Sequence, residues 1–397
     1  MRRVLPISLL RTEPFATLQP MFKKHFLSIL IVVAPAWCQP EVVATGLQGP
    51  NKVVLTPRGN LLISETSTAT DSGRISFVTR GGARRSLFEG LPSGTDSTLT
   101  GGSGPTGLAV RERTLYFALG VGDTERRGQT PGTAVYNPAG YSSPLFCSVI
   151  EVKFDQDLDS ITGTFTISAD HRQTLADGGE ATISDGSGST ARASVLARFP
   201  YAEPSPNTIL RFSNPWGLAL TPDGKSLYVN DASANVIVRV DTATGRWKRV
   251  VRFPQVPNPT PVGPPVVDPV PTSVRIYGNQ LLVSFLSGFP FVPGNTRVQA
   301  VNPDAGTVEP FINGLTSATD VLWRETAAHG SQFYVLEFSL NQSANPAPPG
   351  RLTQFDATGS KVLATPLITP VSMAYDEATQ DLFILELRGQ LLKLHLD

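Results

Sequence analysis

Cysteine and histidine are scarce in this 397-residue chain, and their scarcity excludes several kinds of protein. The chain has two cysteines, Cys38 and Cys147, and four histidines. If residues 1–38 are removed, as argued below, Cys147 is left without a partner, so no intramolecular disulfide can form. With so few histidines we expect neither a catalytic histidine nor a histidine-rich metal site. The Gly-x-Ser-x-Gly motif of many serine hydrolases is also absent.

An excess of charge of either sign is lacking as well. The 33 basic and 33 acidic side chains cancel, and no basic stripe is present, so we expect no nucleic-acid partner. The stretch Gly102–Gly107 spells Gly-x-Gly-x-x-Gly, but an apolar strand follows it where a dinucleotide site would need a helix.

A long hydrophobic run is missing too, because the apolar segment Phe26–Val33 is too short to span a membrane. It follows Lys23 and Lys24 and precedes Ala36 and Cys38 at the −3 and −1 positions of a cleavage site. This pattern is typical of a secretory signal peptide. We therefore expect residues 1–38 to be an N-terminal extension with a signal peptide, and residues 39–397 to be a secreted or periplasmic domain without a transmembrane anchor. A lipid anchor on Cys38 is the alternative, although Trp37 is larger than such sites favour.

A repeated unit decides the fold class. Each unit begins with a proline or small residue, continues as two apolar strands joined by a turn, and ends with two further strands. The first strands of six units begin near residues 49, 104, 214, 270, 318 and 369. Turn sequences such as Pro222-Asp223-Gly224 separate first from second strands. We therefore predict an all-β, six-bladed β-propeller with four-stranded antiparallel blades.

The last unit has three strands before the chain stops. The segment Glu41–Gly46 at the other end supplies the missing fourth strand, which would pair with Leu391–Leu396. Joining the two ends in one blade removes exposed sheet edges and closes the ring. The long insertion at 155–191 has no counterpart in the other units.

Several segments resemble the ScyD/ScyE family, propellers related to the NHL and SMP-30-like types. They are GLPS at Gly90–Ser93, SNPWGLAL followed by NDASAN at Asn230–Asn235, PTSV at Pro271–Val274, LSGFPFVPGNTRV at Leu286–Val298 and YVLE at Tyr334–Glu337. The resemblance runs from about Glu41 to the C-terminus. It implies a six-bladed propeller outside the cytoplasm and supplies no catalytic residues.

The strand order predicts which end of the central channel carries the ligand-binding side chains. If first strands line the channel, then the ends of second strands and the loops that follow them share one mouth. These loops are Thr66–Ser72, Val121–Phe146, Leu286–Thr296 and Phe338–Pro349. We expect ligand-binding side chains at this mouth, namely Glu65, Asp231, Asn235, Phe289, Phe291, Asp320, Glu337 and Glu386.

Four of these acids, Glu65, Asp231, Glu337 and Glu386, end second strands and would suit a divalent cation such as Ca²⁺ if they converge. They could equally cap strands by accepting backbone N–H bonds. Two functions remain open. One is a monomeric binding or scaffold module for a small molecule, glycan or protein. The other is a metal-assisted hydrolase or lyase of the gluconolactonase type, acting on a lactone-like substrate. The residues leave open whether the protein is an enzyme.

Overall fold

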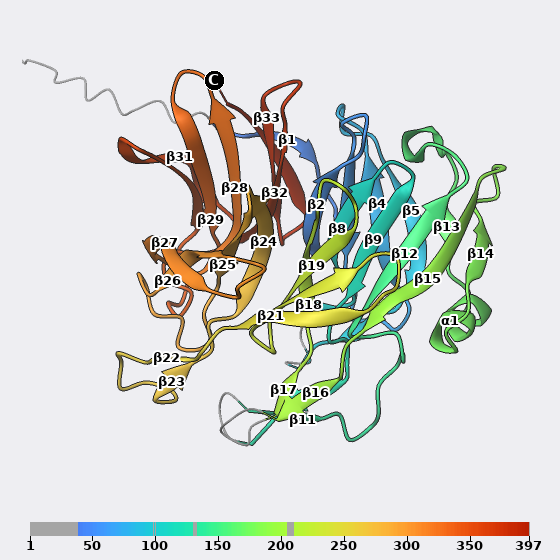
Figure 1. Ribbon diagram of the computed structural model, residues 1–397, viewed down its shortest axis with the longest axis horizontal. Helices are drawn as coiled ribbons and strands as arrows, with labels where there is room; N and C mark the ends of the chain where they lie inside the picture. The colour runs from blue at the N-terminus through green and yellow to red at the C-terminus, as the bar shows by residue number, and fades with distance from the viewer. Residues whose placement is uncertain (1–38, 98, 100, 130–132, 205–209, 397) are drawn as a thin grey trace, which may run out of the picture. The chain divides into compact units, whose positions relative to one another are not determined.

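The computed structural model describes residues 39–97, 99, 101–129, 133–204 and 210–396 (Figure 1). Over these residues, six mostly antiparallel sheets surround a ring formed by their innermost strands. The expected signal peptide, residues 1–38, lies outside the described residues.

Each innermost strand contacts the next around the ring, and the last contacts the first. These strands are β2 (Pro50–Leu55), β8 (Pro105–Arg111), β18 (Pro215–Leu220), β24 (Pro271–Tyr277), β28 (Ala318–Thr326) and β32 (Pro370–Asp376). The closed ring confirms the predicted six-bladed propeller. We number the blades one to six in this order.

The innermost strands share a local sequence rule. Five begin with proline, which can stand at the first position of a strand because no ladder bond from its nitrogen is needed there. The register with the second strand then shifts near the second residue of each strand, which is a β-bulge. In three blades this second residue is threonine, and its hydroxyl donates to the first carbonyl of the next inner strand. The bonds are Thr106 to Pro215 (2.7 Å), Thr272 to Ala318 (2.8 Å) and Thr319 to Pro370 (2.9 Å).

The other strands follow in order from the ring outward. The second strands are β3 (Leu61–Glu65), β9 (Thr114–Leu119), β19 (Ser226–Asp231), β25 (Gln280–Phe285), β29 (Gly330–Glu337) and β33 (Asp381–Glu386). The third strands are β4 (Gly73–Val78), β12 (Ser148–Phe154), β20 (Val236–Asp241), β26 (Thr296–Val301), β30 (Gly350–Asp356) and β34 (Gln390–His395). The fourth strands of blades one to five are β5 (Arg84–Leu91), β15 (Thr190–Arg198), β21 (Trp247–Arg252), β27 (Val308–Leu315) and β31 (Gly359–Leu367).

Blade six takes its fourth strand from the other end of the domain, as predicted. The strand β1 (Glu41–Ala44) runs antiparallel to β34, with Val42 opposite Leu392. The Lys393 ammonium lies 2.9 Å from the Glu41 carboxylate across this pair. The ring is therefore closed by residues from both ends of the described domain.

The 155–191 insertion changes the prediction that every blade has four strands. It forms the 3₁₀ turn η1 (Leu158–Ser160), β13 (Phe165–Thr166), the short helix α1 (Ala169–Ala176) and β14 (Ala181–Ser184). The strand β13 pairs in parallel with β5, and β14 pairs antiparallel with β15, so blades one and two each gain a fifth strand. Phe165 of the insertion stacks on Phe88 of blade one with ring centroids 5.2 Å apart. The insertion thus fastens the outer edges of two neighbouring blades together.

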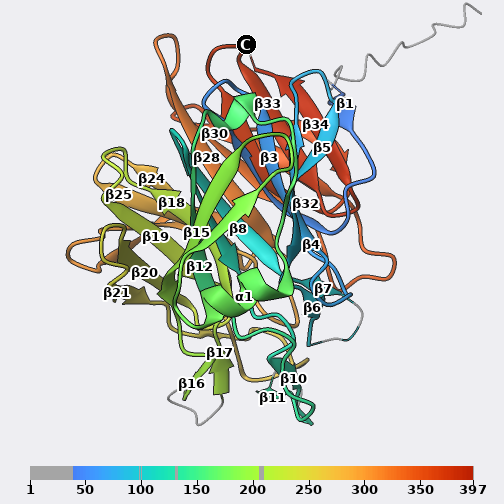
Figure 2. The same cartoon turned by 90° about the vertical axis from the view of Figure 1, so that its right-hand side faces the viewer.

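Four small hairpins add a layer at one end of the ring. They are β6–β7 (Gly94–Thr95 and Gly102–Ser103), β10–β11 (Glu125–Arg127 and Ala134–Tyr136), β16–β17 (Ala202–Pro204 and Leu210–Phe212) and β22–β23 (Val256–Pro257 and Val266–Val267). All lie in connections that leave second strands or lead to the next inner strand, and β11, β16 and β17 lie below the blades in Figures 1 and 2. We call this end the hairpin face and the other end, built mainly of short turns, the turn face. Within the described residues, no helix is long and apolar enough to cross a membrane.

Candidate functional site

The third residue of each inner strand lies at the β-bulge or just after it. These residues are Lys52, Gly107, Gly217, Ser273, Asp320 and Ser372. In blade three a side chain at this position would collide with its surroundings, because a Cβ on Gly217 would lie 2.3 Å from Asn230 Oδ1. A Cβ on Gly107 would lie 2.8 Å from Leu218. Neighbouring atoms of the same blade and the next therefore leave no room for a Cβ at these two positions.

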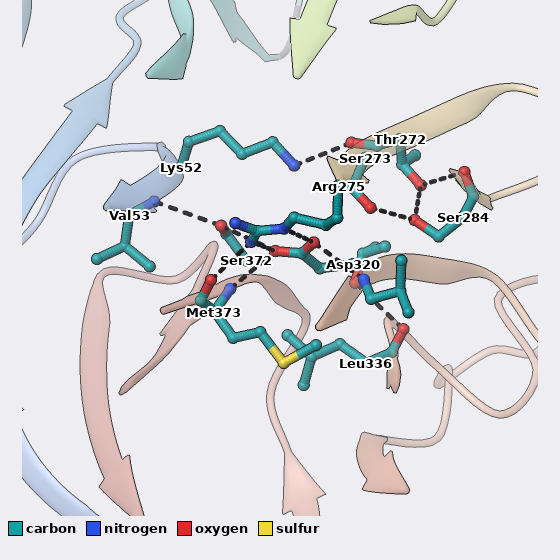
Figure 3. A network of polar contacts seen from close by, with 12 residues as sticks. Lys52, Val53, Thr272, Ser273, Arg275, Ser284, Asp320, Leu336, Ser372 and Met373 are labelled. Carbon is teal, nitrogen blue, oxygen red and sulfur yellow. Dashed lines mark hydrogen bonds and ion pairs between the residues drawn. The ribbon is translucent and has the colours of Figure 1, made fainter. Parts of the chain in front are cut away.

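A buried polar network closes the same level of the ring (Figure 3). The Arg275 guanidinium donates to both oxygens of Asp320, with Nη2–Oδ2 and Nε–Oδ1 distances of 2.7 Å and 3.2 Å. The Ser372 hydroxyl and the Met373 backbone N–H also donate to Asp320 Oδ2, at 3.2 Å and 3.0 Å. Lys52 reaches across from β2 and donates its Nζ proton to the Thr272 carbonyl at 2.9 Å. Four of the six inner strands are joined in this way.

Burial and charge act against each other within the network. Burial raises the pKa of Asp320, but the charges of Arg275 and Lys52 outweigh it and hold that pKa below its usual range. Burial lowers the pKa of Lys52 to about 8, and the Asp320 charge opposes the shift only in part. Beside the network, a cavity lined by Lys52, Leu108, Gly217 and Asp320 measures about 20 Å³, which is room for about one water. This cavity is therefore too small for an organic ligand.

Asp320 was expected at the mouth of the channel, and the structure places it in this network instead. Its side chain is fully buried and has no free edge toward solvent. The bulge at Thr319 turns the third residue inward, which the sequence pattern did not reveal.

The four acids that end second strands share one structural role. Each accepts a hydrogen bond from the backbone N–H of the residue one or two positions before its own inner strand. The bonds are Gln48 to Glu65 (2.5 Å), Asn214 to Asp231 (2.8 Å), Thr316 to Glu337 (2.7 Å) and Ile368 to Glu386 (2.5 Å). All four carboxylates are buried. They fasten the start of the first strand to the end of the second within one blade.

The four sites differ in how their charge is compensated. Arg84 donates to both oxygens of Glu65 at 3.2 Å, and Arg351 donates to Glu337. Burial raises the pKa of Glu386, and the N–H of Ile368 offsets this only in part. Burial likewise raises the pKa of Asp231, against hydrogen bonds from the Ser213 hydroxyl and from three backbone N–H groups, those of Asn214, Ser233 and Ala234.

A shared metal site at these acids is not supported by the geometry. Across the described residues, no group of three or more His, Cys, Asp or Glu side chains is arranged to hold a metal ion. Glu65, Asp231, Glu337 and Glu386 each accept a backbone N–H bond from just before the inner strand of their own blade. The bonding matches the strand-capping alternative.

The hairpin face carries a pocket that the sequence analysis missed. It has a volume of about 150 Å³ and lies between blades two, three and four. Three connections that are far apart in the sequence form its polar lining, through Glu125 on β10, Arg211 on β17 and Asp268 before β24. Its apolar lining comes from Ala134, Leu210, Phe212, Ala232 and Val270. An apolar pocket with a few convergent polar groups is typical of small-molecule sites.

Asn235, one of the expected ligand residues, supports this pocket from below. Its side-chain Nδ2 donates to Asp268 Oδ1 at 3.0 Å, and its Oδ1 accepts the Val270 N–H at 3.1 Å. Gln255 donates to the same Asp268 oxygen at 3.1 Å, and Arg211 forms an ion pair with the other. Asp268 is therefore held from three directions, and the Arg211 charge is already matched.

Glu125 is the lining carboxyl with the most unusual environment. Burial raises its pKa to about 7, and the nearby acids Asp96 and Asp231 add to the rise. A hydrogen bond from Ser97 and the charge of Arg126 oppose it. A carboxyl that titrates near neutral pH in a pocket marks a candidate functional site.

Phe289 and Phe291, the remaining expected residues, lie on the same face in blade four. Their rings meet edge to face with centroids 6.3 Å apart, and Phe289 is 46% exposed. They do not line the 150 Å³ pocket. Of the nine exposed large hydrophobic side chains in the described residues, eight lie in connections of the hairpin face: Leu99, Val135, Tyr136, Tyr141, Val262, Phe289, Ile368 and Leu387.

No family model and no curated protein matches the chain. Solved structures with a similar fold include the PQQ-bound aldose sugar dehydrogenase from Streptomyces coelicolor, at 14% identity over 90% of this chain and 97% of that chain (TM-score 0.48). A streptogramin B lyase is 12% identical over 92% of this chain and 100% of that chain (TM-score 0.45). An auxiliary nutrient binding protein from Bacteroides thetaiotaomicron VPI-5482 is 9% identical over 88% and 69% (TM-score 0.48). At these identities the likeness concerns the fold alone.

Proposed function

We propose that the protein is an exported binding module of the ScyD/ScyE type, which holds a small organic ligand in the hairpin-face pocket. The observation that carries this proposal is the convergence of Glu125, Arg211 and Asp268 on one cavity of about 150 Å³. An engineered cavity of about this size binds benzene, so the pocket suits a ligand of similar bulk. Export is supported by the signal-peptide pattern before residue 39, and the family by the motifs quoted above.

The pocket is favoured over the cavity beside the Lys52–Arg275–Asp320 network, because that cavity measures about 20 Å³ and has room for about one water. It is also favoured over the larger groove of about 400 Å³ on the turn face, between blades three and four. The charged pair in that groove, Arg239 and Asp304, is 3.4 Å apart, and the Asp304 side chain is 86% exposed. Exposed charges of this kind contribute little binding energy.

The binding function is favoured over metal-assisted hydrolysis for a similar reason. Lactone chemistry of that kind needs several ligands around one cation, with room for substrate. The acids expected to supply them hold backbone N–H groups instead.

A small-molecule screen by thermal shift, with one variant that fills the pocket, tests the proposal. Ser233 lines the pocket and is partly exposed, so Ser233→Trp should fill it while the blade stays folded. Ser360→Trp, at an exposed position of β31 on the turn face, is the matched control. A ligand at 100 times its Kd stabilises the folded state by about 2.7 kcal/mol. We expect compounds that raise the Tm of the wild type and of Ser360→Trp but not of Ser233→Trp. Hits that stabilise all three proteins alike would contradict the proposed site.

A further inference from the structure

Three charged side chains line the hairpin-face pocket, and two of them, Arg211 and Asp268, form an ion pair with each other. Arg211 is committed to Asp268, which is itself held by Asn235 and Gln255. Among the described residues, Glu125 accepts a hydrogen bond from Ser97, and the charge of Arg126 lowers its pKa less than burial raises it. The pocket therefore presents one carboxyl that a ligand could neutralise.

Apart from Ser233, the rest of the lining is apolar and partly aromatic. Phe212 forms one wall, and Tyr136 meets its ring edge to face at a centroid distance of 5.1 Å. Tyr136 is 53% exposed, so its ring stands open at the hairpin face. Aromatic faces attract organic cations, because the ring carries negative charge density on its face. An anionic ligand would instead meet the field of Glu125, Asp96 and Asp231.

We propose that the ligand of this pocket is a small organic ammonium ion, whose N–H groups bind the Glu125 carboxylate while its apolar body packs against Leu210 and Phe212. This inference rests on the proposed binding function and specifies the chemistry of the ligand. A carboxylate opposite an ammonium gains a charge-assisted hydrogen bond, which is about twice as strong as a neutral one. The pocket volume suits a benzylamine-sized molecule.

The proposal carries a defined pH dependence. The charged or titratable groups around Glu125 are Asp96 in the β6–β7 connection, Arg126 on β10, Asp231 at the end of β19, Cys147 before β12, and the Arg211–Asp268 pair. The Glu125 pKa of about 7 means that the carboxyl is mostly neutral at pH 6 and mostly ionised at pH 8. An ammonium ion selects the ionised form, so its affinity should rise about tenfold from pH 6 to pH 8. Near pH 6 its binding should also release close to one proton.

Calorimetric titration with benzylamine, and with benzyl alcohol as the neutral analogue, tests the inference. Both are titrated into wild type, Glu125→Gln and Glu112→Gln. Glu112 is an exposed glutamate on the turn face of the same blade, so it is the matched control. We expect benzylamine to bind wild type and Glu112→Gln at least tenfold more tightly than benzyl alcohol at pH 8. Glu125→Gln should lose that preference, and the tenfold pH effect should vanish with it. Titration at pH 6 in two buffers of different ionisation enthalpy measures the proton release.

The outcomes separate this inference from the proposed function. Equal binding of the two probes to wild type, with loss of both in Ser233→Trp, would overturn the ammonium inference and leave the pocket as the binding site. Benzylamine binding that survives Glu125→Gln, or that falls from pH 6 to pH 8, would overturn the role of Glu125. Failure of benzylamine to bind at millimolar concentration would overturn the inference, while the library screen with Ser233→Trp would still decide the proposed function.

Discussion

Asp320 on β28 accepts two hydrogen bonds from the guanidinium of Arg275 on β24. The Nη2–Oδ2 distance is 2.7 Å and the Nε–Oδ1 distance is 3.2 Å. The two strands are neighbours, and Asp320 also accepts bonds from Ser372 and Met373 on β32. One carboxylate thus joins three consecutive blades. The bonds therefore link the inner strands β24, β28 and β32 directly.

Replacing Asp320 with alanine should destabilise the protein by about 3–5 kcal/mol, because Arg275 and Lys52 are then left without their counter-charge. Denaturant unfolding followed by tryptophan fluorescence measures the change. The control is Asp304→Ala, which removes an exposed aspartate on the turn face and should change stability by about 0.5 kcal/mol or less. A loss below about 1 kcal/mol for Asp320→Ala would mean that the network does not hold the ring.

Lys52 gives a prediction about alkaline pH. Its pKa is about 8 in the folded protein and 10.5 as the ordinary value, so the unfolded chain binds more protons between these two values. Stability should therefore rise with pH across this window, by about 3 kcal/mol in total. Lys52→Met lacks the titrating group and should lack the rise. The free energy of unfolding of the two proteins, measured from about pH 7 to pH 10.5, checks the difference. Parallel curves would contradict the lowered pKa.

Glu65 and Glu386 occupy the same position in two blades, yet their glutamine variants should behave differently. Glu65→Gln keeps an acceptor for the Gln48 N–H but leaves Arg84 without its counter-charge. We expect the free energy of unfolding to fall by about 1–2 kcal/mol. This is less than the loss for breaking a fully buried ion pair, because Arg84 is 23% exposed.

Glu386→Gln should instead be neutral or stabilising at pH 7. Burial raises the folded-state pKa of Glu386, so the stability that its neutral form contributes is present below the ordinary value of 4.5 and lost as pH rises through the folded pKa. The variant stays neutral and keeps an acceptor for Ile368. In thermal unfolding, the Tm of the variant minus the Tm of the wild type should therefore increase from pH 4 to pH 7. A constant difference across that range would contradict the shift.

Deleting residues 39–46 should open the ring at blade six. The strand β1 covers the edge of β34, and each lost ladder bond costs about 1 kcal/mol. We expect a total loss of about 3–4 kcal/mol and faster hydrogen exchange in β34. Glu41→Gln, which removes only the exposed ion pair with Lys393, is the control and should change stability by about 0.5 kcal/mol or less. A truncated protein that melts within two degrees of the full domain would argue against the closure.

The fold was predictable because its signals are local and repeated. Proline recurs at the start of inner strands, and an acid recurs at the end of second strands. Once this pattern is recognised in one blade, it identifies the corresponding strands in the others. The closing strand followed from counting strands in the last unit, and the structure places Val42 opposite Leu392.

The site was not predictable in the same way, because its residues belong to no repeat. Glu125, Arg211 and Asp268 stand in three unrelated connections, and nothing in the sequence indicates that they meet. The repeated acids were expected to bind a ligand because they recur at one position in the unit. They recur there because each one accepts a backbone N–H bond within its own blade. Asn235 was expected as a ligand residue and instead supports Asp268.

The most direct test of the account is a crystal structure of residues 39–397 soaked with a benzylamine solution and, separately, with the hits of the library screen. The account predicts ligand density between β10, β17 and the segment before β24, within hydrogen-bond distance of Glu125, while the Lys52–Arg275–Asp320 network stays closed. Density in the turn-face groove beside Arg239 and Asp304, or inside the channel, with the hairpin-face pocket empty, would contradict it.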